Sequence, residues 1–278
     1  MIPNALTIAG IDPSGGAGVL ADVKSFSALG AYGCAVVAAL TAQNTREVGG
    51  VQGVSPAFVR AQLDVLFADV RIDAAKIGML GSAAVTAAVA ESLAPRRRGA
   101  QPALAHLVLD PVMVAKSGDA LLERDAIATL VEAVLPLATL ITPNLPEAGV
   151  LLDRRAPDNE REMRQAAERL RRLLPDAGHA WVLLKGGHLA GDALDLLHDG
   201  DRMIELPAAR IDTPNTHGTG CSLSAAIAAL LPQRGGVPEA VRDAKRWLTE
   251  AIRQSGQLSV GSGHGPVHHF HALWAPPR

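Results

Sequence analysis

The chain has 278 residues, of which 48% are hydrophobic and 3% aromatic, and its formal net charge is −2. This balance argues against a nucleic-acid or membrane partner, because such surfaces need clustered positive charge or rings that stack on bases, and no apolar run reaches the about 18 residues of a membrane span. The N-terminus shows no signal-peptide pattern, and the two sparse cysteines, Cys34 and Cys221, do not suggest a disulfide framework, so we expect a cytoplasmic protein.

Short apolar runs alternate with helical patterns along most of the chain. The runs that predict buried strands cover residues 5–11, 34–40, 74–77, 107–110, 140–142 and 181–184. Helices are predicted from residue 19, from the Ser-Pro pair at 55–56, and over residues 83–93, 159–174, 221–231 and 239–254. Asp199 and Gly200 predict a hairpin between residues 194–198 and 203–206, and the tail from residue 261 is expected to be loop.

This alternation predicts an α/β fold in a single domain over residues 1–278. Strands without polar positions are typical of a mostly parallel central sheet that helices cover on both faces. Nearly every predicted strand runs into a polar or Gly-rich segment, and these segments are residues 12–18, 41–45, 78–81, 110–118, 142–147 and 185–188. Because ligands bind beyond the carboxyl ends of parallel strands, we expect these segments to meet at one edge of the sheet.

The stretch at residues 212–231 is the most informative part of the sequence. Gly218 and Gly220 flank Thr219, and an apolar, Ala-rich helix is predicted from Cys221 onward. Glycines let backbone N–H groups turn into one small space, and the helix start adds unpaired N–H groups and the positive end of its dipole. The pattern predicts an anion hole suited to phosphate, in which the Cys221 thiol is expected to ionise readily. A tight loop that only starts a buried helix is the alternative.

Two other nucleotide-binding patterns fit less well. Residues 16–21 match the dinucleotide fingerprint with Ala21 at the last position. That site needs an acidic residue at the end of the second strand to bind a ribose, but this strand ends in Thr41, Ala42 and Gln43. The sequence has no Gly-Lys-Ser or Gly-Lys-Thr, which excludes a P-loop.

Asn144 and Glu147 stand three residues apart where the fifth strand ends. An amide and a carboxylate near a phosphate site suit a hydrated Mg²⁺, which takes few protein ligands. The same spacing is that of a capping box at a helix start, and without other signals the cap is the better interpretation. Lys185 could pair with a phosphate or be a solvated lysine at a strand end. The histidines, among them His188 and His217, have no zinc-ligand spacing.

Assembled in order, these segments resemble the hydroxymethylpyrimidine/phosphomethylpyrimidine kinases of thiamine biosynthesis, in the ribokinase-like superfamily. The resemblance covers nearly the whole chain, and its motifs lie at residues 6–18, 28–34, 42–45, 76–80, 109–118, 142–147, 184–188 and 215–221. Ile11, where Thr or Ser is expected, is a minor departure. The resemblance implies a three-layer α/β/α sandwich. It also implies ATP-dependent phosphorylation of 4-amino-5-hydroxymethyl-2-methylpyrimidine to its monophosphate and then to the diphosphate.

The same resemblance implies a substrate pocket. Gln43 would bond the aminopyrimidine edge, with Met79 and Val112 against its ring. Gly10 and Asp12 would line the same pocket. Read without the resemblance, Met79 is most simply a filler of the core.

For the phosphoryl transfer, the resemblance implies ATP as co-substrate and Mg²⁺ as cofactor. Glu147 and Asn144 would hold the metal with Asp110 nearby, and Asn144 is also counted among the ATP-binding residues. The residues implied to hold ATP phosphates are Lys185 and the loop 216–220 with Thr216 and Thr219. Cys221, beside the backbone of Gly218 and Gly220, would take the proton of the acceptor hydroxyl, where most ribokinase-like sugar kinases and the pyridoxal kinases have Asp. Such enzymes are usually homodimers.

Two other functions stay open at this point. A pyridoxal-type vitamin kinase is a related activity, and Cys221 in place of Asp argues against it as the main role. A non-catalytic pyrimidine-binding sensor could use the same fold. The presence of Lys185, Glu147 and Cys221 argues against a sensor, since binding alone needs no base.

Overall fold

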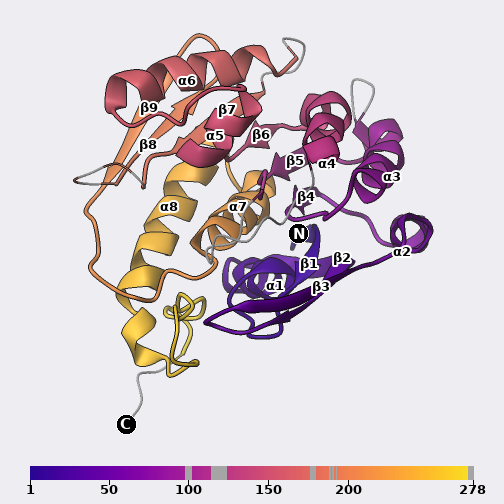
Figure 1. The fold of residues 1–278 in the computed structure, drawn as a ribbon. Coiled ribbons are helices and arrows are strands. Elements are labelled where there is room, and N and C mark those ends of the chain that lie inside the picture. The colour runs from indigo at the N-terminus through magenta and orange to yellow at the C-terminus, as the bar shows by residue number, and fades with distance from the viewer. Residues whose placement is uncertain are drawn as a thin grey trace.

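Figure 1 shows the computed structural model, which describes residues 1–97, 102–113, 124–175, 180–187, 189, 191 and 193–274. Within these residues one sheet of nine strands runs in the order β3-β2-β1-β4-β5-β6-β7-β8-β9. The strands are β1 (Asn4–Ile11), β2 (Tyr32–Gln43), β3 (Val48–Gly53), β4 (Ala74–Ile77), β5 (His106–Leu109), β6 (Leu140–Ile141), β7 (Trp181–Lys185), β8 (Ala193–His198) and β9 (Met203–Ala208).

The centre of the sheet is parallel, as the apolar strands predicted. Strands β2, β1, β4, β5, β6 and β7 pair in parallel. The strands at the two edges, β3 on one side and β8 and β9 on the other, pair antiparallel to their neighbours. Every residue of β4 and β6 is buried, which is the pattern of strands covered on both faces.

Helices cover both faces of the sheet, so the molecule has the expected three layers (Figure 1). The helices are α1 (Gly18–Ala28), α2 (Pro56–Asp69), α3 (Ala83–Leu93), α4 (Arg124–Thr129), α5 (Leu145–Leu151), α6 (Glu160–Arg172), α7 (Thr219–Leu230) and α8 (Val237–Arg253). One core cluster joins the sheet to α2 through α6, and the other joins it to α1, α7 and α8. Among the described residues, no helix has the length and apolarity needed to cross a bilayer.

Helix α7 holds the central place in its layer, against α1, α8 and the strands β1, β4 and β5. Its residues from Ser222 to Leu230 are all buried, and two thirds of that stretch is alanine or serine, which lets the neighbouring backbones come close. Each buried alanine methyl adds only modest hydrophobic stabilisation, so many small contacts fix the helix. As a result the first turn of α7 has a fixed position above the carboxyl ends of the parallel strands.

The structure extends the prediction at two places. Strand β2 continues to Gln43 and pairs with β3, a Gly-rich and mostly exposed strand that hydrophobic periodicity could not indicate. Helix α5 begins directly after Asn144, so the segment at 142–147 is a strand end and a helix start at once. The hairpin at Asp199 and Gly200 is present between β8 and β9.

Candidate active site

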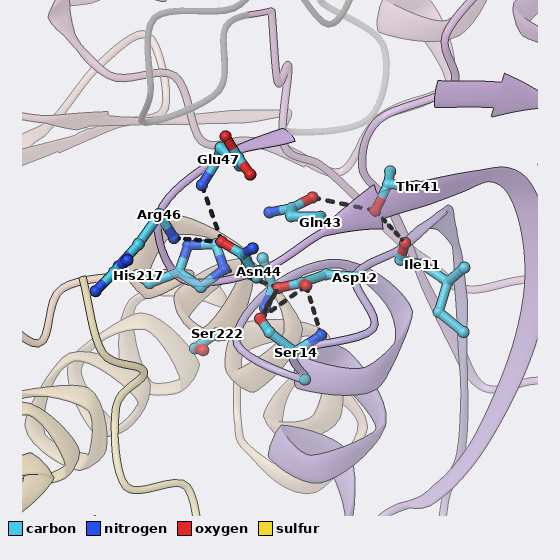
Figure 2. Close-up of polar contacts among 12 residues, drawn as sticks. Ile11, Asp12, Ser14, Thr41, Gln43, Asn44, Arg46, Glu47, His217 and Ser222 are labelled. Carbon is cyan, nitrogen blue, oxygen red and sulfur yellow. Dashed lines mark hydrogen bonds and ion pairs between the residues drawn. The ribbon is translucent and has the colours of Figure 1, made fainter. Parts of the chain in front are cut away.

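Asp12, at the end of β1, is enclosed by hydrogen bonds (Figure 2). Its carboxylate accepts from the backbone N–H of Ser14 at 2.8 Å and of Ala17 at 2.9 Å, and its Oδ2 lies 2.7 Å from Nε2 of His217. Burial alone would raise the pKa of Asp12, but His217 and Ser14 outweigh burial and hold it below the ordinary value. Asp12 therefore ties the turn at 12–18 to the loop that precedes α7.

Glycines allow these two loops to pack backbone against backbone. Gly218 has φ +71°, and a Cβ there would overlap the carbonyl oxygen of Gly16. Gly18 has φ +55°, and a Cβ there would overlap the carbonyl oxygen of Gly10. Both conformations are strained for any residue with a side chain. Gly218, one of the two glycines predicted to shape an anion hole, thus also lets the first loop pack against the loop before α7.

The first turn of α7 faces a lysine and a carboxylate. The position that a Cβ of Gly220 would take lies 3.3 Å from Nζ of Lys185 and 3.8 Å from Oδ2 of Asp110. Thr219 lies on the same turn, and its hydroxyl donates to the carbonyl of Thr216 at 3.2 Å. The free N–H groups of this turn and the ammonium of Lys185 therefore surround one space, as an anion site requires.

Asp110 and Lys185 form an ion pair at the ends of β5 and β7, with 3.1 Å between Oδ1 and Nζ. Thr142 donates to the same carboxylate at 3.1 Å and Ser224 at 3.2 Å. Burial alone would raise the pKa of Asp110, but Lys185 and Lys76 outweigh it and hold the pKa below its ordinary value. Asp110 is therefore a stable anion, and Lys185 is its cation.

Asn144 and Glu147 form the capping box that their spacing predicted. The Asn144 side chain accepts from the N–H of Glu147 at 2.9 Å, and the Glu147 carboxylate accepts from the N–H of Asn144 at 2.7 Å. Burial, aided by the charge of Asp110 and opposed by that of Lys185, raises the pKa of Glu147 to about 7. Because burial disfavours the charged form of the Glu147 carboxylate, a nearby cation would stabilise that charged form.

The residues assigned to the substrate pocket lie at the carboxyl ends of β1, β2, β4 and β5. Gly10 donates to the carbonyl of Met79 at 3.1 Å, and a Cβ on Gly10 would overlap Cε of Met79. Gln43 accepts from the hydroxyl of Thr41 at 3.2 Å and is half-buried (Figure 2). Val112, also half-buried, donates its N–H to the carbonyl of Asp110 at 2.8 Å. Met79 is thus buried against the backbone of β1 near the carboxyl end of that strand, a place that fits both core packing and a pocket wall.

The Cys221 thiol does not ionise readily in this structure, contrary to the expectation from its place at a helix start. Burial raises the pKa of Cys221 to about 11, even though Lys76 and an N–H from Gly18 act in the opposite direction. The helix N-terminus adds only partial charge, and the loss of solvation by a thiolate at this half-buried residue exceeds that benefit. In the free protein Cys221 is therefore a neutral thiol at neutral pH.

The C-terminal tail, which the sequence indicated only as loop, packs on the site. His264 donates its backbone N–H to the carbonyl of Thr45 at 2.9 Å, and His217 donates its N–H to Gly265 at 3.0 Å. His269 lies 2.9 Å from the hydroxyl of Ser222, the residue after Cys221. The tail thus joins the turn between β2 and β3 to the loop before α7. His188 and residues 114–118 of the expected segments lie outside the described residues.

His269 should make the stability of the fold depend on pH. Burial lowers the pKa of this imidazole from 6.5 to about 3. The unfolded chain takes up a proton below about pH 6.5 while the folded state does not, so stability present above that pH is lost as the pH falls. We expect wild type to lose about 2 kcal/mol of unfolding free energy through His269 between pH 7 and 5.

Urea unfolding of His269→Gln at both pH values should show that much less pH dependence than wild type. His264→Gln is the matched control, because His264 lies in the same segment but is exposed. An unchanged pH dependence in His269→Gln would contradict the assignment.

Comparison with known proteins decides the family. The sequence model of the phosphomethylpyrimidine kinase family matches residues 12–268. The chain belongs to the phosphomethylpyrimidine kinase family. The hydroxymethylpyrimidine/phosphomethylpyrimidine kinase of Escherichia coli K12 is 53% identical over 272 residues, which are 98% of this chain and 98% of that protein. The resemblance inferred from the motifs is therefore confirmed.

Solved structures of related kinases have the same fold. The phosphomethylpyrimidine kinase of Clostridium difficile 630 is 38% identical with a TM-score of 0.77, over 91% of this chain and 100% of that one. The Bacillus subtilis pyridoxal kinase, solved as an ADP complex, is 34% identical with a TM-score of 0.86, over 98% of this chain and 99% of that one. The predicted α/β fold is thereby confirmed. The structural relatives of this phosphomethylpyrimidine kinase family member include a phosphomethylpyrimidine kinase and a pyridoxal kinase.

Proposed function

We propose that this protein transfers the terminal phosphoryl group of ATP to 4-amino-5-hydroxymethyl-2-methylpyrimidine, and a second one to the resulting monophosphate, in thiamine biosynthesis. The observation that carries the proposal is the single space between Lys185, Asp110 and the first turn of α7. Phosphoryl transfer requires aligned groups and neutralised charge more than covalent chemistry. A buried lysine and free helix N–H groups supply both to the transferring phosphoryl group.

The acceptor hydroxyl reacts beside Cys221 in this proposal. Lys185 and the backbone of Gly218 and Gly220 hold the phosphate oxygens, and Thr216 and Thr219 support that loop. The thiolate form of Cys221 takes the hydroxyl proton while the oxygen attacks phosphorus and ADP leaves. The pKa near 11 means that little thiolate exists in the free protein, so the bound complex must favour it.

The residues present fit a magnesium ion that arrives with nucleotide phosphates. The described residues contain no group of three or more His, Cys, Asp or Glu that would hold a metal by themselves. Mg²⁺ needs only one or two carboxylates, since waters and phosphates complete its shell. Glu147, with its raised pKa, and Asp110 are the carboxylates that would hold it, with Asn144 close by. When bound, the ion would neutralise charge on the phosphates.

Glu147→Gln separates the metal role from the capping role. Glutamine can still accept the Asn144 N–H, so the cap survives and stability should change by at most about 1 kcal/mol. We expect turnover to collapse at low Mg²⁺ and to recover in part at high Mg²⁺, as measured by ADP release in a magnesium titration.

The control is Glu162→Gln on α6. Asn159 caps the N–H of Glu162 with the same spacing, and the Glu162 side chain lies on the protein surface. Wild-type magnesium dependence in Glu147→Gln would remove the metal role and leave only the cap.

Gln43→Ala tests the substrate pocket. The Gln43 amide accepts one bond from Thr41 and has an N–H₂ group left to meet a polar ring edge. Loss of that partner should cost about 1–3 kcal/mol, seen as a raised Michaelis constant for the pyrimidine with the constant for ATP little changed. Asn44→Ala is the control for the turn itself, because Asn44 accepts from Arg46 and Glu47 (Figure 2). A pyrimidine constant equal to wild type would exclude Gln43 from the site.

A pyridoxal kinase activity is the second candidate, because the Bacillus subtilis pyridoxal kinase has so similar a fold. An assay of ADP release with hydroxymethylpyrimidine, its monophosphate and pyridoxal discriminates the candidates. We expect turnover with the first two to exceed that with pyridoxal. Fast turnover of pyridoxal alone would favour the second candidate, and pyrimidine binding without any ADP release would favour a sensor.

We also infer a cytoplasmic homodimer. Both cysteines are free, as a reducing compartment favours. Large apolar side chains are exposed along one edge of the sheet, where Tyr32 and Leu40 of β2 are 65% and 49% exposed and Val51 of β3 is 51% exposed. Exposed apolar side chains near a sheet edge suit contact with a second copy of the chain. Light scattering after size exclusion should give twice the mass of the chain.

A further inference from the structure

A buried ion pair lies in the core beside α7 and takes no part in the mechanism above. Lys76 of β4 and Asp22 of α1 are both 0% exposed, and 2.8 Å separates Nζ from Oδ2. Thr7 of β1 donates to the same oxygen at 2.6 Å. Removing two charges from water costs several kcal/mol per ion, and hydrophobic residues of similar volume often replace such a pair without loss of stability. Stability alone therefore does not account for the pair.

The elements that carry the pair also surround Cys221. The N–H of Gly18, at the start of α1, is near enough to Cys221 to lower its pKa, and Asp22 follows one turn later on the same face of that helix. Lys76 lies on β4, and α7, which carries Cys221, packs on both β4 and α1. The ion pair thus lies in the core between the elements that pack on α7, close enough for its charges to act on the thiol.

The hydrogen-bonding capacity of the two charged groups in this pair is only partly used. Oδ1 of Asp22 has no hydrogen-bond partner within the part of the chain that the structure describes, and the Lys76 ammonium donates only to Oδ2 there. Gly78 leaves room for this ammonium, since a Cβ at that position would lie 2.7 Å from Nζ. In an interior of low dielectric, charges that are only partly compensated act strongly on their neighbours.

The charges of four side chains act on the Cys221 thiol. Lys76 on β4 and Lys185 on β7 favour the thiolate, whereas Asp22 on α1 and Asp110 after β5 oppose it. Among these charges Lys76 has the largest effect on the pKa of Cys221, and only burial exceeds it. Lys185 is paired with Asp110 and would also bind phosphate. Lys76, whose ion-pair partner is Asp22, is therefore the cation that we expect to stabilise the sulfur anion.

We propose that Lys76 is a positioning residue. Asp22 orients its ammonium group, and the positive charge of Lys76 stabilises the thiolate of Cys221. The proposal rests on the role of Cys221 as base given above. In that step the sulfur lone pair takes the hydroxyl proton, the oxygen uses the O–H electrons to attack phosphorus, and ADP leaves with the electrons of the broken P–O bond. Lys76 gives up no proton and forms no bond to substrate.

Alkylation by iodoacetamide tests the proposal without any kinase activity. In a Cys34→Ala background Cys221 is the remaining cysteine of the chain, and the rate is followed against pH without nucleotide or Mg²⁺. Lys76→Met should lower the rate by about tenfold or more at a fixed pH and move the midpoint upward, since one pKa unit is tenfold in thiolate. Asp22→Asn should raise the rate and move the midpoint downward.

The opposite signs distinguish this role from a structural one. Both substitutions break the same ion pair, so damage to packing would move both rates in the same direction. The double variant Lys76→Met, Asp22→Asn leaves no unpaired buried charge and should fold even where Lys76→Met does not. Its midpoint should lie above wild type, because the effect of Lys76 exceeds that of Asp22. Shifts of equal sign, or unchanged midpoints, would overturn the proposal.

Kinetics separate this proposal from the base role of Cys221. If both hold, Lys76→Met should lower kcat at neutral pH with little change in the Michaelis constants, and Asp22→Asn should not. If the alkylation midpoints shift as expected while kcat stays at the wild-type value in Lys76→Met, Lys76 does stabilise the thiolate and the thiolate is not the base. Unchanged alkylation with a lowered kcat would overturn the electrostatic role.

Discussion

Replacing Cys221 by alanine is expected to lower kcat by about 10²–10⁴-fold, the usual contribution of a general base. The substitution keeps Gly218, Gly220 and the first turn of α7, so the N–H groups that hold phosphate remain in place. Binding of ATP and of the pyrimidine should therefore stay close to wild type. Steady-state kinetics combined with calorimetric binding of each ligand would show this division between binding and turnover.

Cys221→Asp should restore part of the lost activity, because a carboxylate at this position can accept the same proton. Cys34→Ala is the matched control: Cys34 is buried in β2, where burial raises its pKa, and its loss should leave kcat unchanged. Full turnover by Cys221→Ala would show that this residue only packs at a helix start. The acceptor hydroxyl would then lose its proton directly to the transferring phosphate.

Sequence patterns predicted the fold where hydrophobicity decides it. The parallel strands from β1 to β7 are apolar runs, and the family motifs specify the same three layers. Strand β3 was missed because its sequence, Val-Gly-Gly-Val-Gln-Gly, is exposed and Gly-rich, so only its partner β2 makes it a strand. Its existence depends on pairing between strands, which no local pattern contains.

The positions of the candidate residues that follow parallel strands were predicted by one rule, that such segments share an edge of the sheet. The contacts of Lys185 with Asp110, and of Gly10 with Met79, agree with that rule. The roles of these residues stay predictions. The capping box of Asn144 and Glu147 is confirmed, and it is compatible with the metal role because each uses the same carboxylate in a different way.

Quantities that depend on burial in three dimensions could not be predicted. The pKa of Cys221 was expected to fall and instead rises to about 11, since the surroundings of the thiol come from α1, β4 and β5. In the sequence His217 was one of several histidines without a metal-ligand spacing, yet in the structure its ring hydrogen-bonds to the Asp12 carboxylate. Lys76 carried a signal, a charged residue inside an apolar strand, but its partner Asp22 is 54 residues away.

Among the glycines that the structure describes, Gly218 should be the one whose replacement by alanine does the most damage. Alanine at φ +71° is strained by about 1–2 kcal/mol, and its Cβ would overlap the carbonyl of Gly16, which adds about 1–3 kcal/mol of overpacking. Relief of the overlap must separate the turn at 12–18 from the loop before α7 and so displace the N–H groups that hold phosphate. We expect kcat to fall by at least about 10²-fold, as for loss of an oxyanion donor.

Two further glycines divide this effect into its parts. Gly81→Ala has the same kind of strain, with φ +84°, but open space around the new methyl, so urea unfolding should show only about 1–2 kcal/mol of loss. At Gly220 φ is not positive and the nearest atom is the flexible end of Lys185 at 3.3 Å, so Gly220→Ala should fold normally and weaken mainly the affinity for ATP. If Gly218→Ala lost no more stability than Gly81→Ala and kept its turnover, the contact between the two loops would have no part in forming the anion site.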